Sequence, residues 1–163
     1  MRYSSLMSEG SFLRIRERAS RLGYNINLLS INYTDNEFQF LTKSQTTPGV
    51  IWTQRIRLQK TLTPEEVARM TDRELQYRIL DGQLKIFCDC PSFIYWGFAY
   101  KAWMRGYGLV RETRRPIVRN PKEQGMICKH LFAIMQAWKF YAPMIAERYK
   151  IWYDKNKDNP DVQ

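Results

Sequence analysis

The sequence contains little cysteine and histidine, with three Cys and one His among its 163 residues. A small, odd number of cysteines argues against a disulfide framework and suits a reducing, cytoplasmic compartment. The chain also lacks a glycine-rich phosphate loop and paired carboxylates in a recognisable catalytic frame. If a metal takes the only histidine, none remains for acid–base chemistry. We therefore expect a protein that is not an enzyme and has no small-molecule substrate.

Long apolar runs are missing as well. The densest apolar stretch, 93–104, is shorter than the ~20 residues that a helix needs to cross a bilayer, and it contains Lys101. Residues 1–10 lack the apolar core of a signal peptide. These absences predict a cytoplasmic protein without a membrane partner.

Acidic residues are outnumbered, because 26 Lys and Arg stand against 16 Asp and Glu and give a formal net charge of +10. Such a surplus favours polyanionic partners, either nucleic acid or an acidic protein surface. It can also serve solubility alone. Since 44% of the residues are apolar and 14% are aromatic, the chain can bury a substantial core.

The apolar periodicity predicts an α+β fold that begins with a helical N-terminal extension over 1–23. Within it, 11–22 should form an amphipathic helix that ends at Gly23. One face of this helix carries an arginine stripe, which is either solvated or a contact for phosphate; it consists of Arg14, Arg18 and Arg21. The next unit, 24–82, is expected to hold a three-stranded antiparallel meander and a helical segment.

The expected meander is defined by alternating side chains. Leu29 and Ile31 share the apolar face of its first strand, and a turn at 34–36 leads into the second strand. Arg55 and Arg57 lie on the solvated face of the third strand. One face of the sheet should therefore pack on the core while the other meets water.

The helices after the meander are predicted from their start and stop signals. Capping boxes at Thr63 and Thr71 indicate two short helices, or one helix that breaks near Thr71. A strand over 83–89 follows, and Ser92 is expected to cap an aromatic helix over 93–105. Its six aromatic side chains are more typical of core than of a surface that stacks bases. Two of them are adjacent, so at least one should lie at an edge or at a subunit contact; they are Tyr95 and Trp96.

The unit over 83–153 is expected to be a separate module with C-terminal helices, followed by a polar tail over 154–163. Prolines bar a regular helix in 108–127. Pro143 should separate the helix that starts near Cys128 from a further helix.

All three cysteines and the only histidine fall into two short pairs, namely Cys88 with Cys90 and Cys128 with His130. Zinc prefers thiolate and imidazole ligands, and a Cys₃His set closes a four-coordinate structural site. Two ligands separated by one residue reach the same ion only if the backbone turns between them. A strand end followed by Pro91 provides such a turn, and the second pair lies at a helix start. We predict Zn²⁺ bound by all four side chains; buried free cysteines beside an unrelated histidine are the alternative.

A Cys-x-Cys pair on a hairpin, followed at a distance by Cys-x-His at a helix start, resembles the SWIM-type zinc finger. The matching stretches are FCDCPSF and ICKHLFAIM. The resemblance implies zinc on Cys88, Cys90, Cys128 and His130 and a role in binding DNA, RNA or protein. The spacer over 91–127 is longer than is usual in that family. This longer form is similar to small uncharacterised proteins of large tailed bacteriophages, which adds the virion as a second expected location.

The chain between the two ligand pairs also holds the best candidate contact for an anion. We call residues 105–122 the basic loop. Its guanidinium groups can bind phosphate through paired hydrogen bonds. A solvated loop without a partner is an equal alternative. The candidate residues are Arg105, Arg111, Arg114, Arg115, Arg119 and Lys122, with Arg14, Arg18 and Arg21 as further contacts.

Two functions fit these observations. The first is a non-enzymatic, zinc-stabilised module that binds nucleic acid through the basic loop. The second is a structural or adaptor subunit of a phage particle or another large assembly. In that case the same arginines face acidic protein neighbours, and exposed aromatic side chains anchor a subunit contact.

Overall fold

The fold was determined from a computed structural model, which describes residues 1–8, 13–21, 26–60 and 62–157. It is α+β, as predicted. In chain order, its helices and strands are α1 (Tyr3–Ser8), α2 (Leu13–Ser20), β1 (Ile26–Asn32), β2 (Glu37–Lys43), β3 (Ile51–Leu58), α3 (Pro64–Arg69), α4 (Asp72–Asp81), β4 (Leu84–Cys88), α5 (Pro91–Tyr95), α6 (Phe98–Met104) and α7 (Lys129–Asn156).

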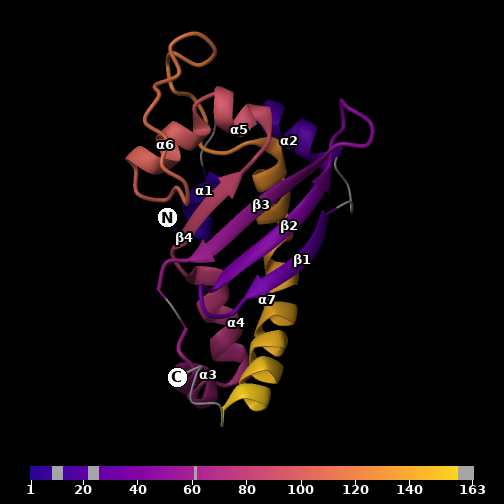
Figure 1. Cartoon of the computed structure of the whole chain (residues 1–163), viewed down its shortest axis with the longest axis vertical. Helices are drawn as coiled ribbons and strands as arrows, with labels where there is room; N and C mark the ends of the chain where they lie inside the picture. The colour runs from indigo at the N-terminus through magenta and orange to yellow at the C-terminus, as the bar shows by residue number, and fades with distance from the viewer. Residues whose placement is uncertain (9–12, 22–25, 61, 158–163) are drawn as a thin grey trace.

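The four strands form one antiparallel sheet in the order β1-β2-β3-β4 (Figure 1). The three predicted strands make up the meander, and β4 adds to it by pairing with β3. The outer side of β4 is covered by backbone hydrogen bonds, from Leu84 N–H to the Met1 carbonyl (2.7 Å) and from Ile86 N–H to the Tyr107 carbonyl (2.8 Å). The strand that ends at Cys88 is therefore held on both sides.

The first strand differs from its prediction. The register of β1 against β2 shifts between Leu28 and Ser30, so Leu29 is a bulge residue and its side chain is 55% exposed. A bulge inserts one extra residue and reverses the alternation beyond it. The inward side chains of β1 are thus Leu28 before the bulge and Ile31 after it, both packed against the core.

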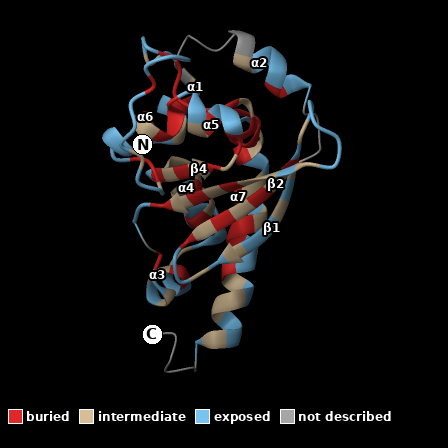
Figure 2. Ribbon diagram, turned by 45° about the horizontal axis from the view of Figure 1, so that its top comes forward, coloured by how far each residue is buried: buried red, intermediate tan, exposed pale blue. Residues whose placement is uncertain are grey.

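Helix α7 is the main partner of the sheet. It runs behind the strands along the long axis of the molecule, and α4, α2, α1 and α3 pack against it (Figure 1). Buried residues gather between the sheet and this helix (Figure 2). At their centre, Trp138 packs against Phe38 of β2 with ring centroids 5.6 Å apart and donates a hydrogen bond to the Ile79 carbonyl of α4 (3.2 Å). One side chain therefore connects the sheet, α4 and α7.

The break predicted at Pro143 is wrong, because α7 continues through it. Proline cannot donate a hydrogen bond to the carbonyl four residues earlier. Buried residues on both sides of Pro143, among them Ala142 and Ile145, fix the helix against the core and outweigh that loss. The helix also extends into the predicted polar tail, whose residues 158–163 lie outside the described part of the chain, as does Gly23.

The aromatic segment also departs from expectation, since it forms two helices rather than one. Gly97 adopts a left-handed conformation (φ +79°) between α5 and α6, which interrupts the helical hydrogen bonding. Cys90, not Ser92, caps the start of α5: Pro91 takes the first helical position, and the Phe93 N–H donates to the Cys90 sulfur (3.4 Å). By contrast, the capping boxes at Thr63 and Thr71 are both formed, and α3 and α4 are separate helices.

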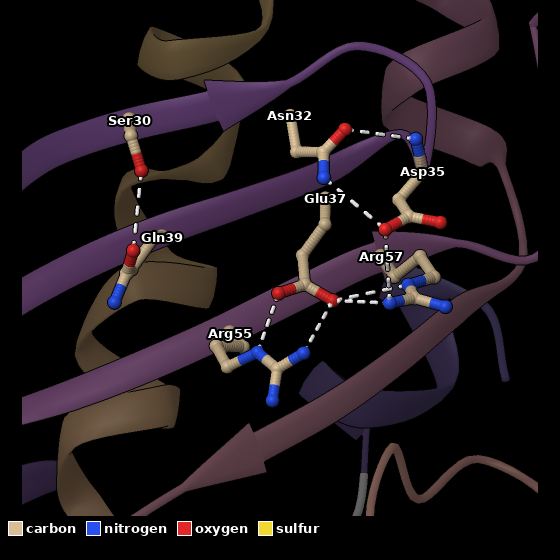
Figure 3. Close-up of polar contacts among 7 residues, drawn as sticks. All are labelled: Ser30, Asn32, Asp35, Glu37, Gln39, Arg55 and Arg57. Atoms are coloured by element: carbon tan, nitrogen blue, oxygen red, sulfur yellow. Dashed lines mark hydrogen bonds and ion pairs between the residues drawn. The ribbon is translucent and has the colours of Figure 1, made fainter.

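The outer face of the sheet is polar, as the alternation of β3 predicts. Glu37 lies between Arg55 and Arg57 and accepts hydrogen bonds from both guanidinium groups (Figure 3). Asp35 reaches Arg57 at 3.7 Å. The two arginines are about one-third exposed, and Glu37 is 12% exposed. These charges thus neutralise one another on the solvated face.

None of the described helices combines the length and apolar character needed to cross a membrane.

Candidate metal centre

The four side chains singled out by spacing lie together in the structure. Their ligand atoms are all within 4.8 Å of one another, and all four residues are buried. Cys88 ends β4 and Cys90 caps α5, while Cys128 caps α7 and His130 lies in its first turn. The cluster joins the end of the sheet to the start of the longest helix, as the two pairs predict.

The first pair is turned inward by the chain reversal between β4 and α5. The Cys90 N–H points back at the Cys88 sulfur (3.5 Å), and the Phe93 N–H donates to the Cys90 sulfur (3.4 Å). Asp89 is directed away from the cluster. Its carboxylate accepts the Thr53 N–H (2.8 Å), and its own N–H donates to the Thr53 carbonyl (3.1 Å). These two bonds anchor the turn to β3 and leave Asp89 outside the ligand set.

The second pair is positioned by the approach to α7. Gly125 has φ +73°, and a Cβ there would lie 3.1 Å from the Phe98 ring, so this position requires glycine for both conformation and space. His130 then directs Nδ1 toward the Cys88 sulfur at 4.0 Å. Its Nε2 is buried and has no hydrogen-bond partner among the described residues.

A further residue that the sequence analysis missed contacts the cluster. Gln54 of β3 donates from Nε2 to the Cys88 sulfur (3.6 Å) and to the Thr42 hydroxyl (2.9 Å), and it is fully buried. Partners outside the ligand set commonly orient metal ligands. A signal for Gln54 was present, because it is a polar residue in the inward-facing row that also contains Trp52 and Ile56.

The electrostatics of the cluster favour a cation. Burial raises the pKa of the Cys88 and Cys128 thiols. The pKa of Cys90 is lowered instead, because hydrogen bonds from the Cys128 and Cys88 thiols stabilise its thiolate. Negative charge thus concentrates on one buried sulfur. A divalent cation that replaced the thiol protons would compensate that charge.

The donor set fits a four-coordinate metal. Around a tetrahedral zinc ion, neighbouring sulfur and nitrogen ligands lie about 3.5–3.8 Å apart, as follows from bonds of about 2.3 and 2.0–2.1 Å. The four ligand atoms lie within 4.8 Å of one another, with 4.0 Å between Cys88 Sγ and His130 Nδ1, so the side chains have to move closer together to reach these distances. The carboxylates nearest in sequence are engaged elsewhere, Asp89 with Thr53 and Glu123 with Arg115. The four residues could therefore bind a metal ion without help from carboxylates.

The basic loop projects beyond α5 and α6 at the same end of the molecule as the cluster (Figure 1). Six of the predicted contact residues lie on it and are exposed; they are Arg105, Arg111, Arg114, Arg115, Arg119 and Lys122. Two of them form ion pairs within the loop region, Arg114 with Glu112 (2.6 Å) and Arg115 with Glu123 (2.9 Å). These two remain 77% and 65% exposed, so their guanidinium groups can still meet a partner.

The loop is fixed to the helices beneath it. Lys101 of α6 is buried and donates from Nζ to the Glu123 carbonyl (2.6 Å) and the Gly125 carbonyl (2.8 Å). Asn120, also buried, donates to the Trp96 carbonyl (3.1 Å). These bonds attach the end of the basic loop, and the residues that follow it, to α5 and α6.

The arginine stripe of α2 lies near the same end. Arg18 and Arg21 are exposed, whereas the side chain of Arg14 lies outside the described part of the structure. Helix α2 packs against α7, and Ile15 lies 3.9 Å from where a Cβ of Gly125 would be. The helix therefore borders the segment that leads from the basic loop to the cluster.

No protein-family model, curated protein or solved structure matches this chain. What the structure establishes is an α+β fold with a buried Cys₃His cluster that could bind a metal ion. The function has to be argued from the cluster and the surface beside it.

Proposed function

We propose that this chain is a zinc-stabilised, non-enzymatic module that binds nucleic acid through the basic loop. Zinc is the metal that a Cys₃His set favours, and such a set leaves no open position for a substrate. The SWIM-like order of the ligands supports the same choice. In this proposal the metal joins β4 to α7, and recognition belongs to the surface beside it.

The observation that carries the proposal is the attachment of the basic loop to the helices beneath it. Asn120 of the loop donates to the Trp96 and Gln124 carbonyls, and Lys101 donates to the Glu123 and Gly125 carbonyls directly after the loop. A backbone attached at these points loses less conformational entropy when its guanidinium groups bind a partner. Guanidinium groups bind phosphate oxygens in pairs, and the net charge of +10 attracts a polyanion from a distance.

Metal content tests the first half of the proposal. We expect one zinc per chain in freshly purified, folded protein, measured by inductively coupled plasma mass spectrometry. Changing Cys90→Ser should abolish the stoichiometric zinc, whereas Asp89→Asn should retain it, because the Asp89 carboxylate bonds to the Thr53 N–H rather than facing the sulfurs. Folded wild-type protein without zinc would contradict the proposal.

Salt dependence tests the second half. Fluorescence anisotropy with labelled oligonucleotides should show affinity that falls steeply as salt rises, because each phosphate that is neutralised releases counterions. Replacing Arg114 and Arg115 together by Ala should weaken binding and reduce the slope while the melting temperature stays close to wild type. Arg69→Ala together with Arg73→Ala serves as a control of equal charge change on α3 and α4. Affinity that is independent of salt would contradict this function.

A second function is favoured by a different observation, the concentration of exposed apolar side chains near the basic loop. The exposed side chains there are Tyr95, Trp96, Trp103, Met104, Val110, Ile117 and Val118. Such a surface, bordered by arginines, also suits a protein partner in a phage particle or another large assembly. Mass spectrometry of purified particles tests this alternative, because a structural subunit must be found in them.

A further inference from the structure

The basic loop and α5 together form a pocket that neither the charge pattern nor the metal cluster explains. Its volume is about 430 Å³, and it is lined by Tyr95, Arg115, Pro116, Ile117, Val118 and Arg119. Tyr95 is 60% exposed, so its ring is available beside the two arginines. The pocket is shallow and open to solvent, so a planar group could enter it from outside.

The segment that lines this pocket is attached to the helices at two points. Pro116 packs against the joint between α5 and α6, where a Cβ on Gly97 would lie only 2.1 Å from the proline ring. Asn120, directly after the lining segment, attaches the chain to α5 through its bond to the Trp96 carbonyl (3.1 Å). Ile117 and Val118 lie between these two attachments and are 77% and 89% exposed. Two apolar side chains are thus held out in solvent next to an aromatic ring and two cations.

We propose that this pocket receives an unpaired base of a single-stranded nucleic acid, stacked on Tyr95, while Arg115 and Arg119 contact the adjoining phosphates. The inference rests on the nucleic-acid function proposed above and specifies its ligand. Proteins bind single strands by combining aromatic platforms with a positive surface that follows the backbone. In a duplex the bases are stacked on one another and paired, so their faces cannot reach a side chain in such a pocket.

The charges agree with this ligand. Glu112 and Glu123 are paired with Arg114 and Arg115, respectively, whereas no hydrogen bond or ion pair joins Arg119 to another described residue. Arg119 also lines the pocket directly. The base would therefore meet Tyr95 and the two aliphatic side chains while Arg119 faces the strand's backbone.

The test measures fluorescence anisotropy with one labelled sequence presented as a single strand and as a duplex, in both DNA and RNA. The single strand should bind at least tenfold more tightly. Tyr95→Ala should weaken single-strand binding about tenfold, since stacking one base contributes about 1–3 kcal/mol. Tyr95→Phe should bind within about twofold of wild type, because the ring is kept. Arg119→Gln should reduce the salt slope by about 0.7, which corresponds to one phosphate of a single strand.

Tyr77→Ala provides a matched control. Tyr77 on α4 is 67% exposed and also lines a cavity with arginines, which has a volume of about 860 Å³ and includes Arg73 and Arg78. The Tyr77 variant should bind like wild type. Because Tyr95 and Tyr77 are both largely exposed, both variants should keep their melting temperatures, so a loss of affinity reports binding rather than folding.

The outcomes separate the two proposals. Steeply salt-dependent binding that is equal for single strand and duplex would overturn the single-strand inference and leave the nucleic-acid function standing. So would a loss of binding in Tyr77→Ala with none in Tyr95→Ala. If neither form binds at low salt, both proposals fail together.

Discussion

At the residue scale, Glu37 shows how one carboxylate organises a polar surface. Burial by itself would raise its pKa, but hydrogen bonds from Arg55 and Arg57 outweigh burial and lower the pKa below its ordinary value of 4.5. A carboxylate whose pKa is lowered on folding stabilises the folded state above its unfolded pKa. That contribution is lost as the pH falls through the lower, folded pKa.

We therefore expect Glu37→Gln to destabilise the protein in a pH-dependent manner. At pH 7 the loss should be about 1 kcal/mol, because the two arginines are one-third exposed and solvent screens the pairs. The difference from wild type should shrink as the pH falls below 4.5, where the unfolded state is protonated first, and should vanish once Glu37 is protonated in the folded state as well. Urea denaturation at several pH values measures it. A difference that stays constant with pH would contradict this account.

Gln54 is the residue for which the structure adds most to the metal cluster. Removing its N–H···S bond with Gln54→Leu should weaken zinc binding about tenfold, the lower end of what such partners contribute. Gln39→Leu is the control, because Gln39 pairs with Ser30 on the opposite face of the sheet (Figure 3). Competition with a chromophoric chelator measures both affinities. Equal affinities for the two variants would show that Gln54 only fills space.

The sequence was sufficient to find the four cluster residues, because rare residue types at short spacing are a local signal. It was not sufficient to find Gln54 or the pairing of Glu37 with two arginines. Both depend on which positions of neighbouring strands lie opposite one another. The register places Gln54 next to Cys88 and Glu37 next to Arg57, and residues far apart in sequence do not reveal it.

At the scale of elements, glycine conformation decides where the aromatic helices end. Gly97 and Gly49 both have φ +79°, but only Gly97 is in close contact, since a Cβ there would overlap Pro116 while one at Gly49 would meet nothing within 4 Å. Comparing substitutions at these two positions therefore distinguishes the cost of backbone strain from the cost of steric overlap.

Replacing each glycine by Ala should reveal the difference. Gly49→Ala should cost about 1 kcal/mol, the strain of the left-handed conformation. Gly97→Ala should cost more, because the basic loop has to move away from α5, and it should also weaken binding to nucleic acid. Chemical denaturation and anisotropy measure the two effects. Equal losses of stability at both positions would mean that Pro116 moves away from the new Cβ at no cost in free energy.

Local signals predicted some elements and failed at others for identifiable reasons. The capping boxes of α3 and α4 are formed because both partners lie within one turn of helix. The break expected at Pro143 and the alternation through Leu29 were wrong, because packing along α7 and a bulge in β1 overrode the local pattern. Neither of these effects is encoded within a short window of sequence.

At the scale of the whole molecule, the cluster connects the sheet to α7, and α7 contacts most of the other helices. If the cluster binds zinc, the free energy of metal binding is also free energy of folding. Chelation should therefore lower the melting temperature. Adding back zinc, but not magnesium, should restore it. His130→Ala should reproduce the chelated state.

Hydrogen exchange can locate this effect. Protection should be lost first in 83–138, which contains both ligand pairs, and later in β1 and β2, which lie at the other side of the sheet. Uniform loss of protection would indicate that the protein unfolds as one unit. An unchanged melting temperature after chelation would show that a metal does not stabilise the folded protein.

The topology that unites these parts was only partly predictable. The sequence indicated the strands and the ligand pairs. It did not indicate that β4 would extend the meander, nor that Lys101 would bind the chain directly after the basic loop. Both are contacts between distant segments that form only when the chain is compact.

The bulge at Leu29 affects how copies of this chain can associate with one another. Strand β1 is the open margin of the sheet, and a straight margin offers a row of unpaired amides on which a neighbour's strand can grow. The extra residue bends that row out of line and interrupts it midway. We therefore expect a deletion that straightened β1 to favour association of copies along this edge.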